Sequence, residues 1–64
     1  MIMKWKNTRF QYQDIAELCH KELDEAGIKV GKIFLDDGYY YVPWMPMSQS
    51  QYETAIQIVC DHIW

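Results

Sequence analysis

Two cysteine and histidine pairs are the residues of this chain that could bind a metal ion. His20 follows Cys19 directly, and His62 lies two positions after Cys60. Zinc sites usually take ligands from spacings such as C-x2-C or H-x3-H, whereas adjacent residues of a helix point about 100° apart. The spacing does not favour zinc, so we expect no metal and no cofactor. Both cysteines have apolar neighbours and no signal peptide is recognisable, so we expect buried, reduced thiols.

No group of residues has the pattern of a catalytic site. A general acid or base needs a concave site, which a chain of 64 residues rarely encloses. Asp36 and Asp37 are typical of a turn, and Ser48 and Ser50 are typical of helix caps. Glu22 falls inside an apolar helical face, where its stem can cover apolar surface. The chain has no phosphate-binding loop, C-x-x-C or H-E-x-x-H motif, so we predict that it is not an enzyme.

Aromatic residues, by contrast, are abundant and clustered. Half of the residues are hydrophobic and 16% are aromatic, and the stretch 36–46, DDGYYYVPWMP, holds four aromatics and two prolines. A domain of this length removes only about 60% of its unfolded surface from water. Some of these rings are therefore expected to be exposed or shared with another molecule.

The last helix is predicted by a capping box formed by Ser50 and Glu53, which starts a helix over residues 51–64. One apolar stripe of this helix is expected to pack on a sheet, and it comprises Tyr52, Ala55, Ile56, Val59, Cys60 and Ile63. Ile58 falls on the opposite side, and Trp64 lies at the edge of the stripe. These two residues are candidates for contact outside the core.

The earlier helix has two competing capping boxes, which start at Thr8 and at Asp14. We favour Asp14, because a start at Thr8 would place Phe10 away from the apolar arc. That arc comprises Ile15, Leu18, Cys19, Leu23 and Ala26. Gly27 is expected to end this helix.

Four strands are predicted around these helices. Residues 3–6 and 9–13 are expected to form a hairpin with a turn at Asn7 and Thr8. Residues 28–35 and 39–42 form a second hairpin, with a bulge at Gly31 that keeps the apolar residues of the first strand on one face. Pro43 is expected to end regular pairing. The sequence thus predicts one α+β domain over residues 1–64, in the order ββαββα, with an antiparallel sheet and both helices on one face. The alternative order, βαββα, differs only in residues 8–13.

The turn of the second hairpin sets which tyrosines share a face. A two-residue turn at Asp37 and Gly38 puts Leu35 opposite Tyr40 and Ile33 opposite Val42 on the core side. It leaves one set of aromatics on the other face: Phe34, Tyr39 and Tyr41. A three-residue turn instead groups Ile33 and Leu35 with Tyr39 and Tyr41. In both registers the second face has no layer to cover it, so this hairpin should expose an aromatic strip.

This strip has three interpretations: ordinary strand formers on a solvated face, a protein interface, or a platform for stacked bases. The leading hypothesis is a small module that binds a larger protein, with a homodimer as a further form of association. The expected binding residues are Phe34, Tyr39, Tyr41, Trp44, Met45, Met47 and Trp64. The size and acidity suit an inhibitor or accessory factor of the kind that phages and mobile elements encode, including antagonists of host defence proteins. The loop from Pro43 to Met47 could also close the core instead.

Nucleic-acid binding is the alternative hypothesis. It would use a basic face formed by Lys4, Lys6 and Arg9 next to stacked tyrosines. The formal net charge of −3 argues against it, because such affinity comes mainly from neutralising phosphates. No apolar run approaches the length of a membrane span, so we expect a cytoplasmic protein without membrane contact.

Overall fold

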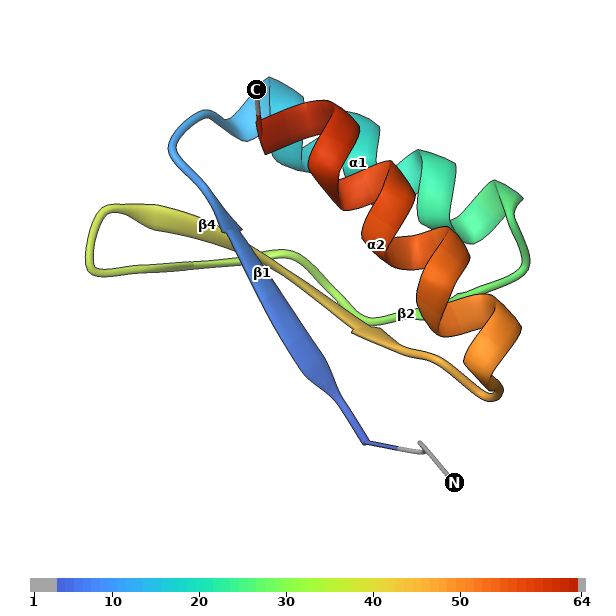
Figure 1. Cartoon of the computed structure of the whole chain (residues 1–64). Coiled ribbons are helices and arrows are strands. Elements are labelled where there is room, and N and C mark those ends of the chain that lie inside the picture. Colours follow the sequence, from blue (N-terminus) through green and yellow to red (C-terminus); the bar gives the residue numbers. More distant parts are fainter. Residues whose placement is uncertain (1–3, 64) are drawn as a thin grey trace.

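Strand β4 (Tyr39–Met45) is the centre of the sheet in the computed structural model, which describes residues 4–63. β1 (Lys6–Phe10) pairs antiparallel with one side of β4, and β2 (Lys29–Val30) and β3 (Phe34–Asp36) pair antiparallel with the other side. Helices α1 (Gln13–Glu25) and α2 (Gln49–Ile63) lie on one face of this sheet (Figure 1). The predicted two-layer α+β class, with an antiparallel sheet and two helices, is confirmed.

The segment before α1 forms a single strand where a hairpin was predicted. Asn7 and Thr8, the expected turn, lie inside β1 opposite Pro43 and Val42. The long β4 explains this, because a continuous β1 beside it carries Phe10 into the core, where the ring is 5% exposed. Residues 8–10 are therefore strand, and the predicted strand residue Met3 lies outside the described residues.

A bulge separates β2 from β3, as the pattern around Gly31 predicts. Residues 31–33 lie opposite only two residues of β4, Val42 and Pro43, and the Gly31 N–H donates to the Pro43 carbonyl at 2.9 Å. The extra residue shifts the alternation of inward and outward side chains by one position, so Ile33 packs against the same core as Ile28. Leu35 remains 63% exposed, because the hairpin tip extends past the helices (Figure 1).

Pro43 does not end β4, contrary to the prediction; pairing continues to Met45. The N–H and C=O of one strand residue point toward the same neighbouring strand. The Pro43 carbonyl accepts from Gly31, so the N–H that proline lacks would point toward the bulge, where the ladder is already interrupted. A proline is therefore tolerated in this central strand.

The α1 helix ends as predicted but buries a different set of residues. The Gly27 N–H donates to Asp24 and the Ile28 N–H to Leu23, the two bonds of a Schellman motif, with Gly27 at φ 83°. The helix starts at Gln13, next to the favoured Asp14, without a side-chain cap. Its buried residues are Ala16, Cys19 and Leu23. The predicted arc is thus rotated, and Leu18 and Ala26 are exposed.

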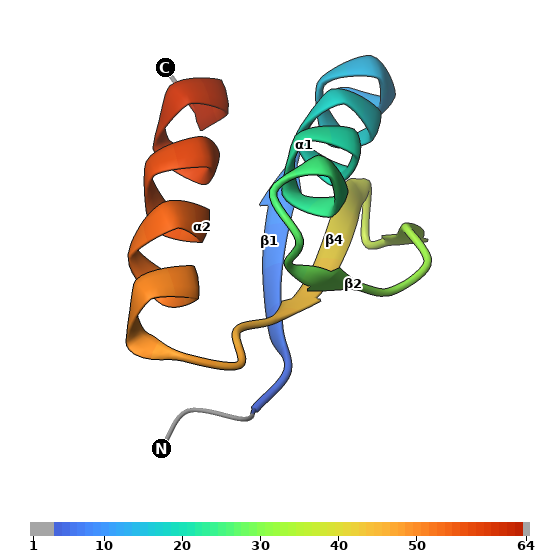
Figure 2. The same ribbon diagram turned by 90° about the vertical axis from the view of Figure 1, so that its right-hand side faces the viewer.

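The α2 helix is capped by Ser48 and not by the predicted Ser50, since the Gln51 N–H donates to Ser48 Oγ at 3.2 Å. Ala55 and Val59 are buried, whereas Ile56 and Cys60 of the predicted stripe are exposed. Ile58, predicted to face outward, packs against the core. The reason is the position of α2, which packs mainly on α1 and not down on the strands (Figure 2).

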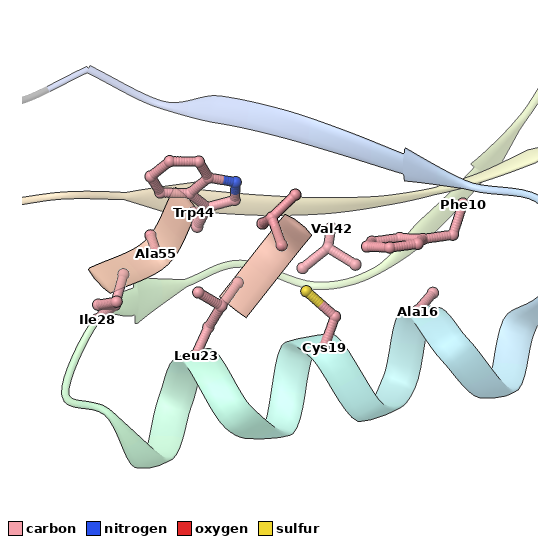
Figure 3. Packing of buried hydrophobic residues seen from close by; sticks show 9 residues of the cluster. Phe10, Ala16, Cys19, Leu23, Ile28, Val42, Trp44 and Ala55 are labelled. Atoms are coloured by element: carbon pink, nitrogen blue, oxygen red, sulfur yellow. The ribbon is translucent and has the colours of Figure 1, made fainter. Parts of the chain in front are cut away.

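The core lies between the sheet and α1 (Figure 3). Phe10 and Val42 point from the strands toward Ala16 and Cys19 of α1, and the Trp44 indole lies beside Ala55 of α2. Val59 of α2 belongs to the same cluster.

Candidate interaction surface

The sheet face opposite the helices, called here the outer face, carries the side chains that alternate with the core residues of β4. Val42 and Trp44 are buried on the helix side. Successive strand residues point to opposite faces, so Tyr39, Tyr41 and Met45 lie on the outer face. All three are half-buried, although both helices of the described residues lie on the other face.

The turn at Asp37 and Gly38 fixes which other aromatics reach the outer face. Both residues have positive φ, 52° and 82°, as a two-residue type I′ turn requires. Asp36 faces Tyr39, Leu35 faces Tyr40 and Phe34 faces Tyr41. The first predicted register is confirmed up to Phe34, and the bulge then shifts Ile33 away from Val42. Phe34, Tyr39 and Tyr41 are thereby brought together on the outer face.

Contacts between side chains on neighbouring strands hold the rings of this surface in place. The rings of Phe34 and Tyr41 stack with centroids 5.1 Å apart and an interplanar angle of 12°. The Arg9 guanidinium lies 4.5 Å from the centroid of Tyr39. Each of these contacts joins β4 to a different neighbouring strand. The outer face thus presents rings held by cross-strand contacts and still open to solvent, with Phe34 44% exposed.

Trp5 also belongs to this surface, which the sequence did not reveal. A Cβ placed on Gly31 would lie 3.5 Å from Cζ3 of Trp5 and 3.2 Å from Cβ of Pro43. The indole therefore reaches across β4, beside Pro43, to the bare backbone of Gly31. Trp5 lies five positions before Phe10, which occupies a core position, so the alternation of side chains along the strand directs Trp5 away from the core.

The segment after Pro43 contributes less to the surface than predicted. Trp44 is only 2% exposed, and its Nε1 donates to Thr8 Oγ1 at 2.9 Å. Trp44 is thus a core residue, because β4 continues through it and turns its side chain toward α2. Pro46 is buried as well, while Met47 is exposed. Trp64 lies outside the described residues.

The three cations of the alternative hypothesis do not form one patch. Lys6 and Arg9 are an odd number of strand positions apart, so they point to opposite faces. The Lys6 ammonium lies 5.4 Å over the Tyr52 ring on the helix side, and Arg9 lies on the outer face. Lys4 is exposed before β1. Lys29 replaces Lys6 as the second outer-face cation, because it pairs with Met45.

Charge is distributed unevenly between the two layers. Seven of the nine acidic residues lie in α1 and α2, which contain only one of the six lysines and arginines, Lys21. The other five cations lie in or next to the strands, together with Asp36 and Asp37 of the turn. The helical layer is therefore strongly acidic, and the strand layer is basic.

A shallow pocket of about 440 Å³ separates α1 from the β3–β4 hairpin. His20, Glu17, Lys32 and Tyr40 are among its lining residues, and His20 Nε2 lies 3.1 Å from the Gly31 carbonyl. This hydrogen bond holds the imidazole against the bulge and gives the histidine a structural role. No third ligand joins any pair of potential metal ligands within residues 4–63.

The two cysteines differ in environment. Cys19 is buried beneath the sheet, and burial, with the nearby Glu22 carboxylate, raises the pKa of its thiol to about 11. Cys60 is exposed, contrary to the prediction, and both thiols are free. A thiol with such a high pKa is a poor nucleophile at neutral pH. Cys19 therefore serves packing.

No protein-family model, curated protein or solved structure matches this chain. In the described part of the chain, neither helix combines the length and the apolar character needed to cross a membrane.

Proposed function

We propose that this protein is a binding module that docks on a larger protein through the outer face of its sheet. The observation that carries the proposal is the cluster formed on that face by Trp5, Arg9, Phe34, Tyr39 and Tyr41. Aromatic and arginine side chains supply most of the binding energy in protein interfaces. Cross-strand contacts hold these rings before binding, which lowers the entropy lost on association.

The biochemical role proposed for this module is that of an inhibitor or accessory factor acting in the cytoplasm. The thiols of Cys19 and Cys60 are both free, as is usual in a reducing compartment. In this role the module acts by occupying a surface of its partner.

Nucleic-acid binding is the second candidate. Arg9 and Lys29 share the outer face with the stacked rings, and aromatic platforms flanked by cations bind single strands. The support is weaker than for a protein partner, because Lys6 points to the helix side and the net charge is −3.

The proposal is tested by photo-crosslinking from the outer face in lysate of the source organism, with and without nuclease. A photoreactive phenylalanine analogue is placed at Phe34 in one variant and at Leu18 in the matched control. Leu18 is equally exposed, 46% against 44%, but lies on α1. We expect one protein to be crosslinked stoichiometrically from position 34, with and without nuclease, and none from position 18.

Competition sharpens the result, because unlabelled wild type should suppress this crosslink whereas unlabelled Phe34→Ser should not. Crosslinking to nucleic acid, or capture that disappears with nuclease, would reject the protein partner and support nucleic-acid binding. Equal crosslinking from positions 18 and 34 would reject the outer face as the docking surface.

A further inference from the structure

One long edge of the sheet is open. β1 pairs with β4 on one side, and no strand within residues 4–63 pairs with its other side. The Pro43 carbonyl points away from β1 toward Gly31, so Asn7 and Pro43 form a non-hydrogen-bonded pair. Arg9 and Tyr41 lie two positions further along the two strands and also form a non-hydrogen-bonded pair. Asn7 and Arg9 therefore direct their backbone N–H and C=O groups to the open edge.

This edge differs from the opposite edge of the sheet, where the bulge divides the pairing into segments of two and three residues. β1 has five residues and neither a bulge nor a proline. Short or bulged edges resist the addition of another strand, whereas a regular edge is a template for it.

The α2 helix lies beside this edge. Figure 2 shows α2 outside β1, on the side away from α1 and β4. Ile58 and His62 are on the side of α2 that meets α1, since His62 Nε2 lies 3.1 Å from Glu22 Oε1. Tyr52, Ile56 and Cys60 follow one another at i, i+4 and i+8 on the other side.

The row formed by Tyr52, Ile56 and Cys60 starts at the edge, because the Tyr52 ring contacts the Lys6 ammonium of β1. Ile56 is 37% exposed and Cys60 is exposed. The row thus continues as an open side of α2 beyond its contact with β1. A further strand beside β1 would extend the sheet under this row.

We propose that the open edge of β1 binds an extended, acidic segment of a partner protein, which adds to the sheet as a strand beside β1. The unpaired backbone groups of Asn7 and Arg9 hydrogen-bond to its main chain. Its alternate side chains point to opposite faces, so apolar residues on one side cover Ile56. Arg9 is the cation of β1 on the outer side, and residues 4–10 contain no carboxylate, so acidic residues on that side of the segment match the charge of the edge.

This site shares Arg9 with the outer-face cluster but does not rest on the function proposed for that cluster. The probe is a pool of short peptides that alternate Glu or Asp with Val, Ile, Leu or Phe. Main-chain hydrogen bonds provide most of the affinity in strand addition, so such a pool is a sufficient ligand. A pool with Lys in place of the acids is the matched control.

Amide hydrogen exchange of the full chain reads out the binding. We expect the acidic pool to slow exchange at Asn7 and Arg9 at least tenfold, with little effect at Thr8, whose N–H already points to β4. Asn7→Pro deletes an outward N–H and should abolish binding, whereas Asn7→Ala should retain it. Ile56→Glu should weaken binding at least tenfold, and Thr54→Glu, which adds the same charge on another side of α2, should not.

Three outcomes would overturn the proposal. Absence of protection at Asn7 and Arg9 with the acidic pool would show that the edge does not accept a strand. Equal protection by the lysine pool would show that the edge does not select acidic segments. Protection that rises with protein concentration without peptide, together with a mass twice the 7.7 kDa of the chain, would assign the edge to a second copy.

Discussion

The indole Nε1 of Trp44 donates to the hydroxyl of Thr8 at 2.9 Å, from the central strand β4 to the edge strand β1. Trp44 is almost completely buried, and a buried ring N–H needs a partner. Thr8 supplies it from β1, where its side chain points to the helix side. This bond ties the position of the edge strand β1 to the core.

Replacing Thr8 by valine should therefore destabilise the protein. Thr8→Val keeps the shape and the strand preference but leaves the Trp44 N–H without an acceptor, which costs about 1–3 kcal/mol. Thr8→Ser retains the hydroxyl and should lose less than half as much. Urea unfolding followed by tryptophan fluorescence measures both free energies of unfolding. Equal stability of Thr8→Val and wild type would mean that the indole does not depend on this bond.

The position of Trp44 marks the limit of what could be predicted from the sequence. Local signals were sufficient for the bulge at Gly31 and for the end of α1 at Gly27, because each depends on a few adjacent residues. They offered a two-residue turn at Asp37 and Gly38, which groups Phe34, Tyr39 and Tyr41 on one face, but left it open against a three-residue turn. The position of Trp44 depended on whether β4 would continue through Pro43, and that was decided by the bulge on the neighbouring strand.

Nonlocal packing accounts for the other differences. The single strand β1 replaced a hairpin because β4 is long enough to pair with all of it. Trp5 reached the outer face as a consequence, and Lys6 and Arg9 were separated onto opposite faces. On α2, Ile56 and Cys60 lost their expected cover because the helix packs beside α1. The hydrophobic periodicity of a single segment predicts none of these outcomes, because each depends on the partner against which that segment packs.

Gly31 keeps the outer face flat enough for Trp5 to lie across it. A methyl group at this position would sit 3.2 Å from Pro43 Cβ, so the proline must shift by a few tenths of an ångström, whereas its 3.5 Å distance from the Trp5 ring is an ordinary contact. Gly31→Ala should lower the free energy of unfolding by about 1 kcal/mol, as overpacking does. The cost should be the same in a Trp5→Ala background, because the tight contact is with Pro43, and a double-mutant cycle in urea measures this. A much smaller cost in the Trp5→Ala background would mean that the indole and not Pro43 opposes the methyl group.

Gly38 is required by the backbone of the turn and not by space around it. Its φ is 82°, and a Cβ added there would meet no atom within 4 Å. Gly38→Ala should thus cost about 1–2 kcal/mol for the left-handed conformation alone. Asp37→Asn, which tolerates positive φ, should leave stability unchanged. Thermal unfolding compares the two variants, and NOEs between Leu35 and Tyr40 report whether the register survives.

Cys19 should make the protein less stable at high pH. Burial and the Glu22 carboxylate raise the pKa of the folded thiol from 9.0 to about 11. Above pH 9 the unfolded chain therefore releases this proton more readily than the folded one, and the unfolded state is stabilised relative to the folded state. The stability contributed by the neutral thiol is complete below pH 9 and is lost as pH rises through 11, by up to about 3 kcal/mol.

Cys19→Ala isolates this effect from the titration of lysines and tyrosines in the same range. Its stability should be lower at pH 7, because a packed sulfur is removed, but should fall less steeply from pH 9 to 11 than that of wild type. Cys60→Ala removes an exposed thiol and should keep the wild-type slope. Urea unfolding at a series of pH values gives the three slopes. A Cys19→Ala slope equal to that of wild type would contradict the raised pKa and leave Cys19 with no part in the alkaline instability.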